Sequence, residues 1–164
     1  MQPDELYWFR LEKSNNLLQN ADSWRSDTNS FARTDTGTNW AVYRFPGNSV
    51  DGTPYLAMNC GGTCATGNSV YQDVAFHPST QTNVDTSPKA TIESGSGSIS
   101  LTVWQLDAAY AVLKSDSYAG NAGSTWATYS FSPTLASGTR ILRYQMYMSG
   151  NATFRVDDLN LAPR

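Results

Sequence analysis

The chain has 164 residues, of which 15% are charged, and its formal net charge is −3. This length predicts one domain that buries roughly two thirds of the surface exposed by the unfolded chain. The negative charge argues against a nucleic-acid partner, because phosphates are bound by basic surfaces. The sequence also lacks the apolar run of about 18 residues that a membrane-spanning helix needs. We therefore expect a monomeric module over residues 1–164, with residues 1–15 as an upstream extension or an extra edge strand.

Apolar and polar residues alternate along most of the chain, which is the pattern of half-buried β-strands. Turn signals rich in glycine, serine and asparagine separate these segments, as at Ser94–Gly97 and Ser149–Asn151. Residues 114–124 are expected to form a loop. Many short strands without a long helical pattern are typical of an all-β sandwich or barrel. The predicted strands are Tyr7–Glu12, Trp40–Arg44, Tyr55–Asn59, Ser69–Phe76, Lys89–Glu93, Ser98–Leu106, Ala109–Leu113, Thr125–Ser132, Arg140–Met148 and Thr153–Leu161.

Two cysteines, Cys60 and Cys64, lie in the segment Cys-Gly-Gly-Thr-Cys. A short glycine-rich loop can bring two Cα atoms within disulfide range. Two thiolates and the single histidine, His77, are too few ligands for a zinc site, and the spacing is not that of a Cys-x-x-Cys redox motif. We predict a disulfide between the two cysteines. A disulfide favours an oxidising compartment, so we expect a secreted or cell-surface location.

Five segments occur in an order known from one group of proteins. They are Asn16–Trp24, Asp51–Leu56, Ser69–Val74, Trp126–Phe131 and the closing Phe-x-x-Asp-Asp-x-x-Leu of Phe154–Leu161. In this order the chain resembles the jelly-roll carbohydrate-binding modules, especially the galactose-binding-like group around families 4, 9 and 22. The first segment departs from the family, because it reads Asn-Ala-Asp-Ser-Trp where the family has a Phe-Glu pair. The resemblance implies an all-β fold, a jelly-roll β-sandwich of two antiparallel sheets.

The resemblance also implies a structural calcium ion that joins the first and last strands. It places Asp157 at the family's carboxylate ligand, with the carbonyls of Asp51 and Gly52 as further ligands. Asp22 would replace the glutamate that is absent here. Calcium prefers six to eight oxygen ligands of this kind. The alternative is that Asp157 and Asp158 pair with an arginine or accept backbone N–H groups.

Strand alternation separates the side chains of each strand into two faces. The pairing rules of a jelly roll place residues 69–76, 140–148, 98–106 and 109–113 in one sheet. Its outer face would display Tyr71, Trp104, Tyr110, Arg143, Gln145 and Tyr147. Aromatic rings stack on the apolar faces of sugars, while arginine and glutamine donate hydrogen bonds to hydroxyl groups.

Three features of this predicted face stay open. Trp104 packs under a loop in one alternative, and Arg143 pairs with Asp73 across the strands in another. Trp40 and Tyr43 lie before the first strand of the roll and either wall the groove or pack its end.

These residues predict non-catalytic binding of a polysaccharide or oligosaccharide by an accessory module of a secreted glycan-active protein. The chain has one histidine, no nucleophile elbow and no evident pair of facing carboxylates, so we do not expect an enzyme. One alternative is an architectural or protein-interaction β-sandwich. The other is a jelly-roll polysaccharide lyase, which would depend on Tyr110, Tyr147 or His77.

Overall fold

The structure is a computed structural model, and it describes residues 16–18, 32–34, 40–45, 55–60, 67–78 and 80–164. These residues form β-strands and connecting segments and include no helix, which confirms the all-β prediction. Within this described part there is accordingly no helix of the length and hydrophobicity needed to cross a membrane. The predicted strand Tyr7–Glu12 and the possible extension 1–15 lie outside the described residues.

All strand pairs are antiparallel and form one eight-stranded and one two-stranded sheet. The small sheet joins β5 to β10. The strands in chain order are β1 (Ala32–Thr34), β2 (Trp40–Phe45), β3 (Tyr55–Cys60), β4 (Ser69–Ala75), β5 (Val84–Asp85), β6 (Lys89–Leu106), β7 (Val112–Asn121), β8 (Ala127–Thr128), β9 (Ile141–Asp157) and β10 (Ala162–Pro163).

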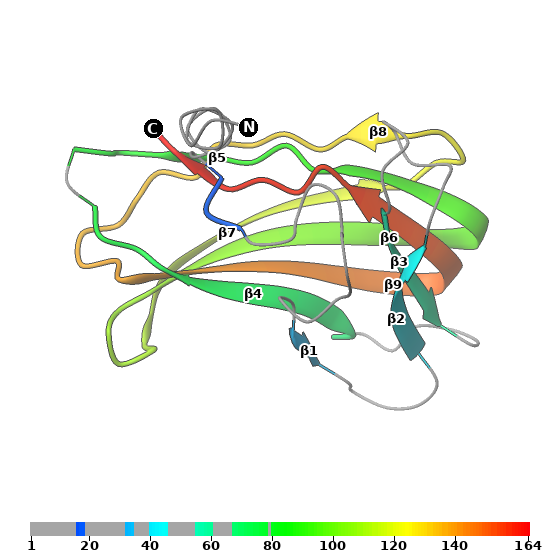
Figure 1. The fold of residues 1–164 in the computed structure, drawn as a ribbon, viewed down its shortest axis with the longest axis horizontal. Helices are drawn as coiled ribbons and strands as arrows, with labels where there is room; N and C mark the ends of the chain where they lie inside the picture. The colour runs from blue at the N-terminus through cyan, green and yellow to red at the C-terminus, as the bar shows by residue number, and fades with distance from the viewer. Residues whose placement is uncertain (1–15, 19–31, 35–39, 46–54, 61–66, 79) are drawn as a thin grey trace, which may run out of the picture.

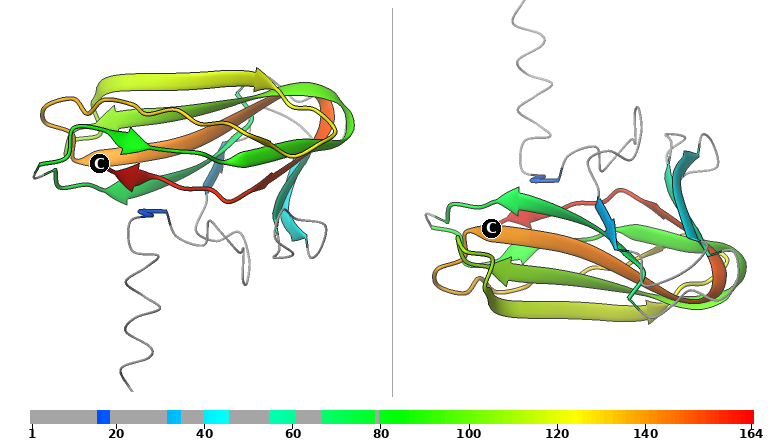
Figure 2. Two further views of the ribbon diagram at one scale, coloured as in Figure 1. Left: turned by 90° about the horizontal axis from the view of Figure 1, so that it is seen from above. Right: turned by 90° about the horizontal axis from the view of Figure 1, so that it is seen from below.

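Strands β6 and β9 form a long ribbon that organises the larger sheet. They pair from Lys89 opposite Asp157 to Leu106 opposite Ile141. At one end of the ribbon β9 also pairs with β4 and β6 with β7, whereas at the other end β9 pairs with β3 and β6 with β8. The ribbon curls over between these ends, as the green and the orange-to-red strands show at the right of Figure 1 and in both views of Figure 2. One hydrogen-bonded sheet thus supplies both layers of a sandwich.

Glycines form the bend of this ribbon. Gly95 and Gly150 have φ angles of +84° and +99°, in the left-handed region that other residues rarely adopt. The strands also approach closely there, because a Cβ added at Gly95 would lie 1.9 Å from the carbonyl oxygen of Asn151. The register shifts between Ile92 and Ser94, just before the bend. A bulge of this kind increases local twist and lets a strand change direction.

The predicted turns Ser94–Gly97 and Ser149–Asn151 are therefore wrong as chain reversals. Gly97 is paired with Gly150, and both segments continue within β6 and β9. Each glycine-rich segment permits a bend without ending the strand, because glycine tolerates the unusual backbone angles while the ladder partners remain in place.

The pairings 55–59 with 153–161 and 69–76 with 140–148 are confirmed, as is the placement of 89–93 beside 125–132. The strand predicted at Ala109–Leu113 and the loop predicted at 114–124 are wrong, because β7 begins at Val112 and runs to Asn121. Its sequence has little hydrophobic alternation, since its inward side chains include Lys114, which donates to the Thr134 carbonyl and hydroxyl oxygens.

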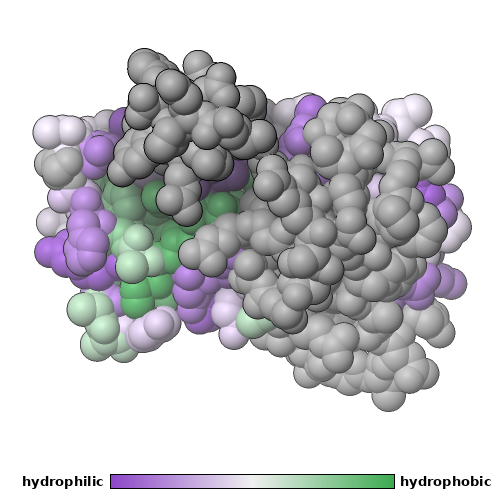
Figure 3. All heavy atoms as spheres, in the orientation of Figure 1, coloured by the Kyte–Doolittle hydropathy of each residue, from purple (hydrophilic) through white to green (hydrophobic). Residues whose placement is uncertain are grey.

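The core lies between the two layers. Ile99, Leu101 and Val103 of β6 are buried in it, as the alternation predicts. So are Leu142, Tyr144, Met146 and Met148 of β9. In Figure 3, hydrophobic residues gather in the left half of the view, with hydrophilic residues around them. The side chains that alternate with these core residues therefore point away from the core, toward the surface.

The chain ends are tied together beside the second layer. The Asn16 side chain donates to the Leu159 carbonyl oxygen and accepts the Leu161 N–H, both at 2.9 Å. The Leu17 N–H also donates to the Leu161 carbonyl oxygen. The described residues of the first segment, 16–18, therefore lie beside the last segment.

The glycine bend generates a stability prediction. Gly150→Ala would place a Cβ 2.5 Å from the Ser96 carbonyl oxygen at a positive φ, so we expect it to lower the free energy of unfolding by about 2–4 kcal/mol. Gly123→Ala is the control, because a Cβ there meets no atom of the structure within 4 Å. Urea denaturation of both variants measures the difference. Equal stabilities would show that the bend does not require glycine.

Candidate functional site

Strands β4, β9, β6 and β7 lie side by side in one layer (Figure 2). Ladder pairing aligns Tyr71 with Gln145 and Asp73 with Arg143 between β4 and β9. Arg143 is in turn opposite Trp104 of β6. Because these residues alternate with the buried core residues, they occupy the outer face of the layer. The sequence-based assignment of this face is thus matched by the strand register.

The face carries a hollow of about 350 Å³ where β6 ends. Five of the six residues predicted for this face line the hollow, and the sixth, Tyr71, lies beneath one of them. Its lining residues are Trp104, Leu106, Tyr110, Val112, Arg143, Gln145 and Tyr147. Leu106 and Val112 were not predicted, because only aromatic rings and hydrogen-bonding side chains were selected as candidates. The hollow combines three aromatic rings with an amide and a guanidinium group.

Arg143 is fixed by two neighbours from β4. Its Nε and Nη2 donate to the two carboxylate oxygens of Asp73 at 2.7 and 2.8 Å. The guanidinium carbon also lies 4.5 Å from the centre of the Tyr71 ring. The hydrogen bond with Asp73 is the main reason why the pKa of Arg143 is raised, and burial opposes it. The cross-strand alternative for Arg143 is therefore realised, and the pair brings no net charge to the hollow.

Trp104 and Tyr147 meet on the floor of the hollow. The Trp104 indole N–H is buried beside the Tyr147 hydroxyl group but forms no hydrogen bond of regular geometry with a described residue. Burial raises the pKa of Tyr147, while the nearby Trp104 N–H and the Arg143 charge lower it in part. Both side chains are half-buried. Both rings offer surface to a ligand. The buried Trp104 N–H reduces the stability of the fold, because a buried donor without a well-placed acceptor is unfavourable.

Gln145 is more buried than predicted for a residue that bonds a ligand. Its amide nitrogen donates to the Ser69 hydroxyl oxygen at 2.7 Å. This bond links β9 to β4 below the hollow and holds the Gln145 amide plane in one orientation. The main role of Gln145 is therefore to form and fix the floor of the hollow.

The two remaining aromatic candidates lie elsewhere in the sheet. Trp40 and Tyr43 belong to β2, where they pair with Cys60 and Ala57 of β3. Strand β3 joins β9 at its far end, beyond the bend. The structure therefore does not bring the β2 backbone into the face formed by β4, β9, β6 and β7.

Of the predicted calcium ligands, the structure describes Asp157 alone. Its carboxylate is fully buried at the end of β9, and its Oδ1 accepts the Asp158 N–H at 3.0 Å. Asp158 forms an ion pair with Lys89 at 2.5 Å, so its carboxylate is engaged by a lysine where the sequence suggested an arginine. The described residues hold no cluster of three His, Cys, Asp or Glu side chains. Asp22, Asp51, Gly52 and Cys64, the predicted disulfide partner of Cys60, lie outside the described residues.

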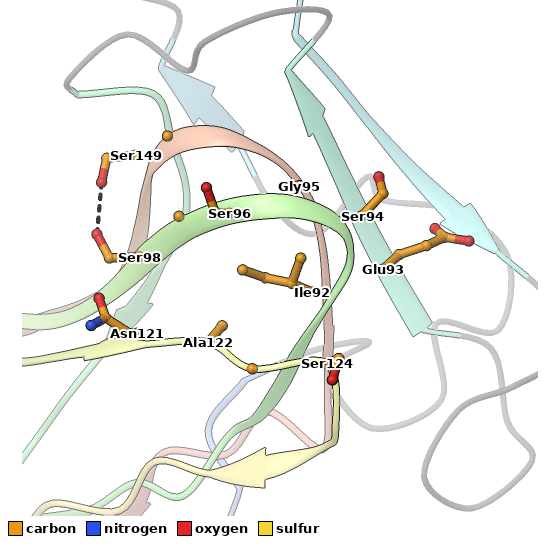
Figure 4. A pocket seen from close by; sticks show the side chains of 13 residues that line it. Ile92, Glu93, Ser94, Gly95, Ser96, Ser98, Asn121, Ala122, Ser124 and Ser149 are labelled. Carbon is orange, nitrogen blue, oxygen red and sulfur yellow. Dashed lines mark hydrogen bonds between the residues drawn. The ribbon is translucent and has the colours of Figure 1, made fainter.

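A larger hollow of about 720 Å³ lies at the bend of the ribbon (Figure 4). Serine hydroxyls dominate its lining, and Ser98 and Ser149 are hydrogen bonded to each other at 2.7 Å. Glu93, the charged residue of the lining, is ion paired with Arg155. No aromatic ring is present among the described lining residues. This hollow lacks a stacking surface, so the smaller hollow over Trp104 is the better candidate for a sugar.

A third hollow of about 230 Å³ lies on the same ribbon. It shares Tyr147 with the hollow over Trp104, and Ser98 and Ser149 with the hollow at the bend. The β6–β9 ribbon therefore contributes residues to all three hollows. The sequence did not indicate the hollow at the bend, because the small residues that form it were interpreted as turns.

No family model and no curated protein matches the sequence, but solved structures do. The enzymatically active domain of tailspike protein 4 from bacteriophage CBA120 is matched with a TM-score of 0.76 at 13% identity. This match covers 92% of this chain and 22% of the tailspike chain. The CBM22-1–GH10 modules of Clostridium thermocellum xylanase Xyn10B, complexed with xylohexaose, give a TM-score of 0.68 at 11% identity, over 91% of this chain and 29% of that one.

A separate module matches over nearly its whole length. TmCBM61 in complex with β-1,4-galactotriose gives a TM-score of 0.68 at 13% identity, covering 91% of this chain and 99% of the module. The chain therefore has the jelly-roll β-sandwich fold of carbohydrate-binding modules, as the sequence predicted. It spans less than a third of the length of the tailspike and xylanase chains.

The Arg143–Asp73 pair generates a second prediction. We expect a double-mutant cycle of Asp73→Ala and Arg143→Ala to give a coupling energy of about 1 kcal/mol in urea denaturation, because the bond is bidentate and partly shielded from water. The exposed pair Arg164–Asp85, at 3.3 Å, is the control and should couple by less than about 0.5 kcal/mol. Additive effects at Arg143 and Asp73 would contradict the structural role of the pair.

Proposed function

We propose that this protein binds a polysaccharide or oligosaccharide through the hollow over Trp104 and does not cleave it. The observation that carries the proposal is the gathering of Trp104, Tyr110 and Tyr147 around Arg143 on one open sheet face. Two of the structures with the same fold were determined with xylohexaose and β-1,4-galactotriose, which supports a carbohydrate partner.

The proposed interaction is stacking of sugar rings on the aromatic side chains. Each stack contributes on the order of 1 kcal/mol beyond the area that it buries. Arg143 and Gln145 border the same hollow and would orient sugar hydroxyl groups. Ordering a flexible glycan on the protein opposes binding, so we expect dissociation constants in the roughly micromolar to millimolar range.

The charge balance of the hollow favours a neutral glycan. Asp73 occupies two donor groups of Arg143 and neutralises its charge. An acidic glycan would therefore find no uncompensated cation among the residues that line this hollow. Hydroxyl groups need no such cation and can exchange water for the polar groups at the rim.

We further propose that the domain is an accessory module of a secreted glycan-active protein. It spans only part of the tailspike and xylanase chains that share its fold, which supports a modular arrangement. Of the residues that the lyase alternative invoked, Tyr110 and Tyr147 line the hollow, but His77 is exposed outside it, so the hollow has no histidine to act as a base. A binding role without catalysis is therefore the function that this geometry supports best.

Affinity gel electrophoresis tests the binding proposal. The wild-type protein should be retarded by one or more of xylan, β-1,4-galactan, mixed-linkage β-glucan and carboxymethyl cellulose, without loss of polymer viscosity. Trp104→Ala should remove most of the retardation and leave thermal unfolding cooperative, because it deletes the central ring of the hollow. No retardation by any polymer would favour the architectural alternative, and falling viscosity would favour the lyase.

Trp126→Ala is the matched control for this experiment. Trp126 contacts the Tyr55 ring edge-to-face at 6.1 Å between centroids and does not line the hollow. The Trp126→Ala substitution removes a ring of the same size from another part of the sandwich. If both variants lose binding equally, the loss reflects damage to the fold and the assigned face is wrong.

A structural calcium ion remains a proposal that rests on Asp157. A fully buried carboxylate needs strong compensation, and a divalent cation supplies it where oxygen ligands converge. If calcium binds only the folded state, millimolar calcium should raise Tm by several degrees after removal of metal with EDTA. Asp157→Asn should abolish this calcium response. An identical Tm with calcium and with EDTA would exclude a stabilising calcium site.

A further inference from the structure

Tyr110 holds a backbone conformation that its side chain disfavours. Its φ is +65°, in the left-handed region that a bulky residue rarely occupies. Strain of this kind persists only where the surroundings enforce it, and it is concentrated at functional sites. Tyr110 does not recover the cost by burial, because 58% of its surface is exposed.

Asp107 enforces this conformation. Its Oδ1 accepts the N–H groups of Ala109 and Ala111 at 2.8 and 2.9 Å. Its backbone N–H donates to the Ala111 carbonyl oxygen at 3.0 Å, and its carbonyl oxygen accepts the Tyr110 N–H at 3.1 Å. Four hydrogen bonds therefore define the backbone of this short connection between β6 and β7, in which Tyr110 directly follows the turn residues Ala108 and Ala109.

The connection directs Tyr110 to the edge of the hollow. Tyr110 lines it together with Val112, whose surface is also 58% exposed, and with Trp104 and Arg143. Glycine or asparagine would adopt the same backbone angles at lower cost. Stability alone does not explain an exposed aromatic ring at this position, whereas contact with a ligand does.

We propose that Tyr110 is a pre-positioned stacking residue of the glycan site and that Asp107 is the positioning residue that holds it there. This inference rests on the proposed function. The ring is ordered when the protein folds, so a ligand would not have to order it on binding. A rigid ring at the end of the hollow would also restrict which sugar orientations fit, so Tyr110 would contribute to specificity as well as to affinity.

Substitutions at Tyr110 test the stacking role. The probes are xylan, β-1,4-galactan and mixed-linkage β-glucan in affinity gels with the full chain. Tyr110→Gly should weaken the strongest interaction of the wild type about fivefold, which corresponds to the loss of one aromatic contact. Tyr110→Phe keeps the ring and should stay within about twofold of the wild type. Tyr110→Gly should also leave Tm unchanged or raise it by roughly 2 °C, because it relieves the strained backbone.

Substitutions at Asp107 test the positioning role. Asp107→Ala should weaken binding about threefold, since one aromatic contact is partly lost. Asp107→Asn retains a side-chain oxygen that accepts the same N–H groups, so it should restore the wild-type affinity. A merely structural role would lower Tm in Asp107→Ala and leave affinity, measured well below Tm, unchanged.

Two results would overturn the inference in distinguishable ways. If Trp104→Ala loses binding and Tyr110→Gly retains it, the hollow binds glycan without Tyr110, and only the inference fails. If the wild type is retarded by none of the three polymers, the inference and the neutral-glycan proposal both fail. If Asp107→Asn loses binding as Asp107→Ala does, the hydrogen bonds to the N–H groups of Ala109 and Ala111 are not sufficient to position Tyr110 for binding.

Discussion

The close approach of two bent strands is the constraint on which the rest of the structure depends. The β6–β9 ribbon folds over where Gly97 is paired with Gly150. At Gly95 and Gly150 a side chain would collide with the backbone of the opposite strand. Because the ladder continues through the bend, the two layers of the sandwich share the same strands. Their separation and alignment are therefore fixed by covalent continuity as well as by core packing.

This arrangement explains how the candidate site becomes rigid. Before the bend, β9 lies between β4 and β6, and side chains that alternate with the core residues Leu142 and Tyr144 face outward. Arg143 is held by Asp73 on the neighbouring strand, and Gln145 by Ser69. Cross-strand bonds of this kind fix side chains on a surface where no core would hold them. The floor of the hollow is thus ordered by the sheet itself.

Much of the fold and of this face could be predicted from residue alternation combined with the strand pairing that the jelly-roll resemblance implies. The core side chains of β6 and β9 were predicted correctly. Side chains alternate between the two faces of a strand, so the assignment has little ambiguity when one face is strongly apolar. The site residues then followed, because Tyr71, Trp104 and Arg143 occupy the intervening positions. The pairing of Asp73 with Arg143 could be proposed from register but not decided, since a guanidinium group can equally face solvent or a ligand.

The failed predictions have a common physical origin. Glycine and serine occur both in chain reversals and in bends of a continuous strand, and local sequence does not distinguish the two. Strand β7 was missed because its inward face carries Lys114 and Asp116, which bond to each other and to neighbouring groups. The positive φ of Tyr110 gave no sequence signal either, because it arises from the Asp107 side chain and not from a glycine.

The energetic character of the candidate site differs from that of the core beneath it. Core residues such as Met146 and Val103 are buried among apolar neighbours, where their placement stabilises the fold. On the opposite face of the same strands, the buried N–H of Trp104 has no hydrogen bond of regular geometry to a described residue, and Tyr110 has a strained backbone at an exposed position. Neither feature improves folding, and both lie on the border of one hollow. Unfavourable features persist in folded proteins chiefly where function requires them, because selection for stability alone would remove them. Comparable features also occur away from the hollow, at the buried Tyr144 hydroxyl group and at the positive φ of Asp158, so their meeting at one hollow supports the proposed ligand-binding role only in combination with the fold.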